Sequence, residues 1–271
     1  PEDYTAGVTA VNAASGVSLS GYADRFKITD QQNLSPPPPT TSWKLKYNGS
    51  ALVLNQATTV IPSTATWKTL KNAIEASTLE NGDEFVIKGT ITATSTTGDH
   101  GAISVTKKIT VKGAGSTPTL NASSLSRVFT VENGGELTLE KLTLKNGNDH
   151  KGGGIYAGTG TKVNLNVKII IQECKATDGG AIYNDGGTLT IKGASVIKGN
   201  EVTNKGGAFL IKSGSLHMEN NCIVEQNKAK KGGGIYITDS GSAEILYCHV
   251  RQNEAQDDGG GIFVAGDTAC T

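Results

Sequence analysis

The chain has 271 residues, and its 25 basic and 25 acidic side chains cancel to a formal net charge of zero. A neutral chain offers no basic field to nucleic acid or anionic lipid, so we expect no nucleic-acid partner. We also expect no direct membrane span, since no stretch reaches the roughly 18 apolar residues of a spanning helix, and a signal peptide and anchor are expected to lie outside this chain.

Residues 1–62 are predicted to form a small β-rich segment. The prolines at 36–39 form a stiff polyproline II linker in this prediction. After them, Asn48-Gly49 separates two alternating runs, Trp43–Tyr47 and Ser50–Leu54. Asn-Gly suits the type I′ turn of a two-residue hairpin, so a β-hairpin is expected here. How this segment sits relative to the rest of the chain does not follow from the sequence.

Residues 63–82 are predicted to hold an amphipathic helix, with Thr64 or Thr66 as its N-cap. Its apolar face is formed by Trp67, Leu70, Ala73 and Ile74. Solenoid proteins cover their open ends, and Glu80–Asp83 turns from this helix directly into the strands that follow. We therefore expect the helix to be the N-terminal cap of a solenoid that spans residues 83–271.

From about residue 140 the chain repeats one short phrase five times. The copies are Gly152-Gly153-Gly154-Ile155-Tyr156, Gly179-Gly180-Ala181-Ile182-Tyr183, Gly206-Gly207-Ala208-Phe209-Leu210, Gly232-Gly233-Gly234-Ile235-Tyr236 and Gly259-Gly260-Gly261-Ile262-Phe263. The bulky residue recurs at steps of 27, 27, 26 and 27 residues. So constant a period indicates one structural unit stacked on copies of itself. Residues 83–146 alternate less regularly and are expected to form irregular coils of the same solenoid, giving about seven or eight coils in all.

A second register lies eight or nine residues before each bulky position. It is occupied by Asn146, Cys174, Asn200, Asn227 and Asn253. Asparagine tolerates the left-handed backbone region and carries both a donor and an acceptor. Stacked copies are therefore expected to form a structural ladder of hydrogen bonds, interrupted at Cys174.

Between the two corners the apolar residues alternate with period two, which is typical of strands. A period near 27 also occurs in leucine-rich repeats, but those carry leucine at fixed offsets, whereas the apolar positions here mix Ile, Val, Tyr and Leu. Strands of successive coils that pair in parallel, about 4.8 Å apart, would place identical positions in columns. We therefore predict an all-β protein, a right-handed single-stranded parallel β-helix with an N-terminal capping helix and a small hairpin-containing N-terminal segment.

The paired signature resembles the repeats of the polymorphic outer membrane proteins of chlamydiae and of related spirochaetal surface proteins. It combines the Gly-Gly-Ala/Gly-Ile/Phe phrase with an apolar residue three positions before an Asn. In those families the apolar residue is usually Phe, whereas here it is Ile197, Val224 or Val250, with Ile171 before Cys174. The resemblance covers roughly residues 140–265. It implies a bacterial cell-surface or outer-membrane location, or secretion, and an adhesin or autotransporter-like passenger.

Aromatic residues follow the inward-pointing bulky position and are the predicted binding residues: Tyr156, Tyr183, Tyr236 and Phe263. On the outer face they would form a flat stripe that contacts sugars or partner side chains. The alternative is that these rings only stack on one another and stabilise the sheet. Further along the same strands, Asp185 beside Lys212 is the one outward pair of catalytic type, and a solvated ion pair is the alternative there.

We expect no cofactor and no metal site, because no Cys-x-x-Cys or Cys/His cluster occurs and the calcium-binding β-roll spacing is absent. Cys222 and Cys248 are one repeat apart, which allows either a disulfide or two stacked free thiols.

Three functions remain open. The first is a non-enzymatic surface protein, without catalytic residues, that binds a host surface or matrix protein or glycan. The second is a carbohydrate-active β-helix, either a polysaccharide lyase or a glycosidase. The third is a structural scaffold that associates end to end through an uncapped C-terminal coil.

Overall fold

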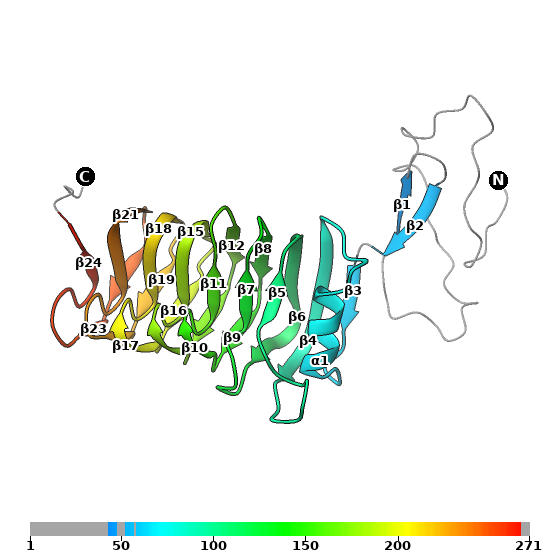
Figure 1. Cartoon of the computed structure of the whole chain (residues 1–271), viewed down its shortest axis with the longest axis horizontal. Helices are drawn as coiled ribbons and strands as arrows, with labels where there is room; N and C mark the ends of the chain where they lie inside the picture. The colour runs from blue at the N-terminus through cyan, green and yellow to red at the C-terminus, as the bar shows by residue number, and fades with distance from the viewer. Residues whose placement is uncertain (1–42, 48–51, 57, 267–271) are drawn as a thin grey trace.

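The computed structural model describes residues 43–47, 52–56 and 58–266, and the statements below refer to these residues (Figure 1). The predicted polyproline linker at 36–39 and Cys270 lie outside them. Antiparallel pairing of β1 (Trp43–Tyr47) with β2 (Leu52–Gln56) confirms the predicted hairpin. Its register differs from the expected two-residue turn, because Tyr47 stands opposite Leu52 and not opposite Ser50.

The remaining strands form a parallel solenoid of about eight turns, in which the chain passes through four strand columns per coil (Figure 1). Column A contains β5 (Ile103–Val105), β7 (Phe129–Val131), β11 (Ile155–Ala157), the first parts of β15 (Ile182–Ile191), β18 (Phe209–Met218) and β21 (Ile235–Ile245), and β24 (Ile262–Val264). Column B contains β3 (Thr58–Ile61), the first parts of β4 (Asp83–Thr92) and β6 (Lys108–Asn121), β8 (Glu136–Glu140), β12 (Lys162–Val167) and the second parts of β15, β18 and β21.

The other two columns are built from shorter strands. Column C contains the second parts of β4 and β6, then β9 (Thr143–Lys145), β13 (Ile170–Gln172), β16 (Val196–Lys198), β19 (Ile223–Glu225) and β22 (His249–Arg251). Column D is a separate sheet of β10 (Asn148–Lys151), β14 (Lys175–Asp178), β17 (Glu201–Lys205), β20 (Lys228–Ala229) and β23 (Glu254–Ala255).

The register follows the sequence repeat. Ile182 pairs with Ile155 on one side and with Phe209 on the other, and Phe209 pairs with Ile235. These bulky residues are fully buried and form part of one continuous core that runs along the inside of the coils. Ile262, at the same position in the last described coil, is 42% exposed because no further described coil covers it.

Charged side chains in column D also follow the register. Lys175, Glu201, Lys228 and Glu254 stand opposite one another on successive coils. The Lys228 and Glu254 side chains form an ion pair of 2.9 Å, and those of Lys175 and Glu201 one of 3.6 Å. The signs therefore alternate from coil to coil along this column, as cross-strand pairing favours.

The predicted cap is present as α1 (Trp67–Ile74), whose Trp67, Leu70 and Ile74 side chains are buried in the core. The helix lies against β5, the strand at the N-terminal edge of column A. The Trp67 ring nitrogen donates to the Gly101 carbonyl at 2.8 Å, and the Glu75 carboxylate accepts the Ser104 N–H at 2.7 Å. These bonds satisfy backbone groups that an uncovered edge would expose.

The start of the solenoid differs from the prediction of residue 83. β3 already pairs in parallel with β4, with Val60 opposite Val86, so the shaft begins at Thr58 and the helix is inserted within its first coil. The boundary predicted at residue 62 therefore falls inside the solenoid. β3 begins with two threonines and is followed directly by Pro62, so its sequence is too short and polar to predict a strand of the solenoid. Only its pairing with β4 identifies it as one.

The helix start gives a first testable prediction. The Thr66 hydroxyl accepts the Thr69 N–H at 3.2 Å and so caps α1. We expect Thr66→Ala to lower the free energy of unfolding by about 1 kcal/mol, because one N-terminal donor of the helix loses its partner. Urea denaturation measures this. Thr66→Ser keeps the oxygen and is the matched control, and equal stability of the Ala and wild-type chains would contradict the capping role.

Candidate functional site

The predicted aromatic residues stand in one row on the outer side of column A. Tyr156 is opposite Tyr183, and Tyr236 is opposite Phe263. The rings of each pair stack, with centroids 5.9 Å and 5.0 Å apart. Leu210 fills the row between Tyr183 and Tyr236. The order of the row is thus the predicted one. The bulky residue that precedes each ring in the sequence points inward, as at Ile155 and Ile182 in the core.

The expected flat, open stripe is wrong for the middle of this row. Tyr183 and Tyr236 are each 5% exposed and Leu210 is 4% exposed, and together they form a second apolar cluster outside the main core. Tyr156 and Phe263 are partly buried against the same cluster. The central rings therefore pack against their neighbours, and a binding partner cannot contact them directly because other side chains cover them.

Basic side chains provide that cover. Lys151 lies over the Tyr183 ring at 5.2 Å, Lys205 over Tyr236 at 4.9 Å, and Lys231 over Phe263 at 5.4 Å from nitrogen to ring centroid. Arg127 lies over Tyr156 in the same way, at 5.2 Å. Each contact is worth about 0.5–1 kcal/mol at an exposed site. We call these four cation and ring pairs the ring–cation strip.

Sequence reasoning missed these cations, although a signal for them exists. Lys151, Lys205 and Lys231 each directly precede a glycine pair, and each reaches the ring that lies one coil further on. Before the glycine pair at 179–180, the residue at this position is Asp178 and not a lysine. In the coil that follows Asp178, the ring position is occupied by Leu210. A cation thus precedes the glycines where a ring follows, and an acid does so where a leucine follows.

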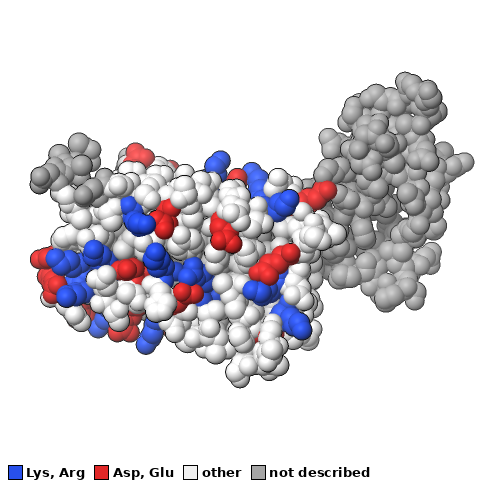
Figure 2. Space-filling view, viewed as in Figure 1, with Lys and Arg blue, Asp and Glu red and all other residues white. Residues whose placement is uncertain are grey.

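The residues before the glycine pairs also form a row of their own. Lys151 pairs in register with Asp178, Asp178 with Lys205, and Lys205 bridges to Lys231. Lys231 forms an ion pair with Asp258 at 3.0 Å, whereas no carboxylate of the described residues lies within ion-pair distance of Lys151 or Lys205. Figure 2 shows basic and acidic side chains gathered together on the C-terminal half of the shaft.

Arg127, at the N-terminal end of the strip, is held by a two-point contact. Its Nε donates to Asp149 Oδ2 at 3.1 Å, and its terminal nitrogen lies 2.7 Å from Asp149 Oδ1. Burial acts to raise the pKa of the Asp149 carboxyl, but the hydrogen bond and charge of Arg127 outweigh it and lower the pKa. Arg127 is therefore engaged, which leaves Lys151 and Lys205 as the cations of the strip with the freest charge.

The predicted Asp185 and Lys212 pair is present, at 2.9 Å between the carboxylate and the ammonium nitrogen. The Tyr156 hydroxyl donates to the other oxygen of Asp185 at 3.0 Å. Burial acts to raise the Asp185 pKa, yet these two hydrogen bonds and the charges of Lys212 and Lys151 together outweigh it and lower the pKa. Asp185 is accordingly a carboxylate acceptor at neutral pH, which suits an ion pair or a base and not a general acid.

Tyr183 lies beside the same carboxylate. Burial, together with the charges of Asp185 and Asp178, raises the pKa of Tyr183 to about 12. Its hydroxyl therefore stays protonated at neutral pH and is available as a hydrogen-bond donor. The ring–cation strip thus lies beside a carboxylate, that of Asp185, which the Tyr156 hydroxyl contacts directly.

The predicted ladder is confirmed for three of its four asparagines. The Asn200 side-chain amide donates to Asn227 Oδ1 at 2.9 Å, and that of Asn227 donates to Asn253 Oδ1 at 2.9 Å. Cys174 ends the series, where its backbone N–H donates to Asn200 Oδ1 at 3.0 Å. Asn200 and Asn227 are fully buried, so these are internal structural bonds and not binding groups.

Asn146 is not part of this ladder, which corrects the prediction. The pairing of Gln172 with Lys145 aligns Cys174 with Gly147 and places Asn146 opposite Glu173. Both residues at that position have positive φ, 53° and 57°. The Asn146 amide bonds instead to Asn121 Oδ1 at 3.0 Å. Asn146 therefore supplies a left-handed backbone position, which asparagine tolerates.

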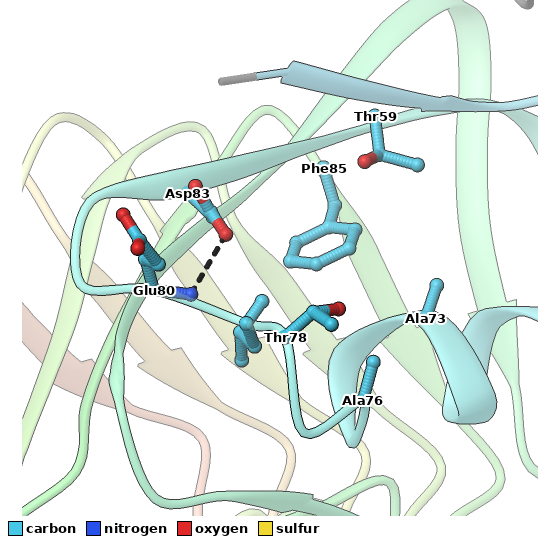
Figure 3. Close-up of a pocket in the computed structure, with 8 residues that line it drawn as sticks. Thr59, Ala73, Ala76, Thr78, Glu80, Asp83 and Phe85 are labelled. Carbon is cyan, nitrogen blue, oxygen red and sulfur yellow. Dashed lines mark hydrogen bonds between the residues drawn. The ribbon is translucent and has the colours of Figure 1, made fainter. Parts of the chain in front are cut away.

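A cavity of about 460 Å³ lies at the N-terminal end, between α1 and the first strands of column B (Figure 3). The Phe85 ring and the methyl groups of Ala73 and Ala76 line it on the apolar side. On the polar side the Glu80 N–H donates to Asp83 Oδ2 at 2.9 Å, which closes the turn after the helix. This arrangement joins the cap to the shaft and presents no convergent set of reactive groups.

Within the described ranges, no cluster of three or more His, Cys, Asp or Glu side chains is arranged to hold a metal ion. Cys174, Cys222 and Cys248 are free thiols. Among the residues that the structure describes, no helix is both long and apolar enough to cross a bilayer.

Parallel coils with in-register columns and an internal asparagine ladder define a β-solenoid repeat protein. The chain belongs to the right-handed β-helix family, because the family model for a right-handed beta-helix region matches residues 107–271, more than half of its length. Comparison with curated proteins and with solved structures finds no match in either set.

Proposed function

We propose that this protein is a non-enzymatic β-helix of a bacterial cell surface or secreted fraction, with repeats of the polymorphic outer membrane protein type and the role of an adhesin or autotransporter-like passenger. The shaft presents an extended face from which it binds a host surface or matrix protein or a glycan. Fold alone does not give function, so the proposal depends on one feature of the surface.

That feature is the ring–cation strip. It repeats a cation over a ring on four coils, interrupted at the coil of Leu210, so a long partner can make several similar contacts along one line. Individually weak contacts that act together give a high overall affinity when the geometry lets them engage at once. Because no carboxylate of the described residues forms an ion pair with Lys151 or Lys205, an anionic partner gains charge-assisted hydrogen bonds there.

The strip can be tested by removing charge without uncovering the rings. Lys151→Met with Lys205→Met keeps unbranched side chains over Tyr183 and Tyr236 while deleting both ammonium groups. We expect the double variant to bind epithelial cells and matrix-coated surfaces about tenfold more weakly or worse, because charge-assisted hydrogen bonds are lost. The remaining binding should also depend less on salt.

The matched control is Lys162→Met with Lys168→Met, which removes the same charge from two exposed lysines elsewhere on the shaft. Its binding should equal that of the wild-type chain. If the strip variant binds as strongly as this control, the strip is not the contact surface. Substitution of Tyr183 or Tyr236 is unsuitable as a binding test, because both rings are buried and their loss would disturb packing.

The second candidate function, a carbohydrate-active β-helix, has one observation in its favour. Asp185 is held between Lys212 and the Tyr156 hydroxyl on the outer face, where β-helix glycan chemistry requires carboxylates next to a basic group. Turnover of uronate polymers by the wild-type chain, lost in Asp185→Asn, would favour the enzyme over the adhesin.

End-to-end association is the third candidate, and it is separable from both. The last described coil exposes Ile262 and leaves Tyr247 87% exposed. Sedimentation at increasing protein concentration tests it, since Ile262→Lys should then reduce association without altering binding through the strip.

A further inference from the structure

Two cysteines occupy the same position on neighbouring coils. Cys222 directly precedes β19 and Cys248 directly precedes β22, and Ile223 pairs in register with His249. The His249 N–H donates to the Cys222 carbonyl at 2.9 Å, so the two coils are already joined at this point. Neighbouring strands lie about 4.8 Å apart. That separation falls within the range of Cα distances that disulfides bridge.

The two thiols differ in accessibility. Cys222 is fully buried, whereas Cys248 is partly exposed and packs on the edge of the core. Each donates to a carbonyl of its own turn, Cys222 to Glu219 at 3.1 Å and Cys248 to Leu246 at 3.3 Å. Burial raises the pKa of Cys222 to about 11, and the adjacent Cys248 contributes to the rise. Cys248 is therefore the thiol that an oxidant reaches first.

We propose that Cys222 and Cys248 are a disulfide site that joins the last coils of the described shaft. The inference is independent of the ring–cation strip and does not rest on adhesion.

A dissolved disulfide such as oxidised glutathione is the oxidant. The Cys248 thiolate attacks one of its sulfurs, forms a mixed disulfide and releases one glutathione thiolate. The Cys222 thiol then loses its proton, attacks Cys248 Sγ and expels the second glutathione. Two thiols are oxidised and one glutathione disulfide is reduced.

The bond would act where the shaft is otherwise weakly held. Leu246 and Tyr247, just before Cys248, are exposed, and no described coil covers the far side of β22. Five residues further on, the Asn227 and Asn253 side chains join the same two coils by a hydrogen bond. A covalent link beside that hydrogen bond would restrain opening of the last coil.

The preceding coil indicates a substitution that the core should tolerate in place of the thiol. Ser195 stands at the position of Cys222 one coil earlier, since Val196 pairs with Ile223, and it is fully buried. Its hydroxyl donates to the Lys192 carbonyl three residues before it, as Cys222 does to Glu219. Cys222→Ser therefore reproduces an arrangement that the core already contains. Cys174→Ala is the control, because Cys174 lies in the asparagine column and away from the pair.

The experiment uses the full chain with Cys270→Ser, equilibrated with oxidised glutathione and then mapped by peptide mass spectrometry. We expect a loss of two hydrogens and one cross-linked peptide pair that contains Cys222 and Cys248. The loss should vanish in Cys222→Ser and Cys248→Ser and persist in Cys174→Ala. Oxidation should slow proteolysis of the last coil about tenfold or more.

Two outcomes of the mapping with Cys270→Ser overturn the proposal. In one, both thiols remain open to alkylation after equilibration, or stop at stable mixed disulfides with glutathione. In the other, the cross-linked peptides contain Cys174. Repeating the mapping with Cys270 present identifies whether that cysteine competes for Cys248, and a bond between Cys248 and Cys270 in preference to Cys222 also counts against it.

Discussion

Replacing Gly207 with alanine is expected to lower the free energy of unfolding by about 3 kcal/mol or more, at or above the upper end of the usual cost of overpacking. A Cβ on Gly207 would lie 2.1 Å from the Gly233 carbonyl oxygen and 2.8 Å from the Lys228 nitrogen. Both are backbone atoms of the next coil, so neither can rotate away as a side-chain end would. Relief requires the two coils to separate at the glycine corner, where the Gly207 N–H donates to the Gly232 carbonyl.

A matched control separates this clash from backbone strain. Gly199 has a φ of 62°, and a Cβ built there meets nothing within 4 Å. Gly199→Ala should therefore cost only the left-handed penalty, about 1–2 kcal/mol. Urea denaturation of both variants gives the comparison. Equal losses at the two positions would show that the close approach of coils is not what requires glycine at 207.

Asn227→Ala is the second substitution with a large expected effect, a loss of roughly 3–5 kcal/mol. Asn227 Oδ1 accepts both the backbone and the side-chain N–H of Asn200, at 3.0 Å and 2.9 Å. Its own amide donates to the Ile197 carbonyl at 3.0 Å and to Asn253. Alanine leaves several buried groups without partners, and each such group costs about 1–3 kcal/mol.

The comparison for this prediction is Asn146→Gly. Asn146 lies outside the ladder and has positive φ, a conformation that glycine adopts without strain. We expect its free energy of unfolding to fall by about 1 kcal/mol or less, from the single bond to Asn121. Thermal or urea unfolding measures both, and a larger loss for Asn146→Gly than for Asn227→Ala would contradict the assigned ladder.

The fold followed from the sequence because the repeat fixes the register. Once Ile155, Ile182 and Phe209 are spaced by one coil, strand pairing, core position and the asparagine ladder follow by geometry. The cap was predictable for a similar reason, since its apolar face is local and its N-cap is a single residue. Spacing alone failed at Asn146, because the ladder position lies eight residues before the bulky residue in some coils and nine in others. The count therefore does not decide which of two neighbouring corner residues, Asn146 or Gly147, stands in the ladder column.

The candidate site was only partly predictable, and the cause is physical. Alternation correctly placed the aromatic rings on the outer side of column A, but it carries no information about what reaches over them. Long side chains from the corner cross to the next coil, so Lys151 covers Tyr183 although 32 positions separate them in the printed sequence. Contacts of this kind depend on side-chain length across coils and not on strand periodicity.

The alternating charges of column D disfavour pairing of a coil with the wrong coil while this chain of similar repeats folds. If the coil of Glu201 were looped out during assembly, Lys175 would stand opposite Lys228, and if the coil of Lys228 were looped out, Glu201 would stand opposite Glu254. Either error brings two side chains of the same sign together. Like charges directly opposite each other are unfavourable, which biases the chain toward assembling its units in their proper succession. Concentrated salt weakens this discrimination, so refolding in it should yield more misassembled chains than refolding in dilute buffer.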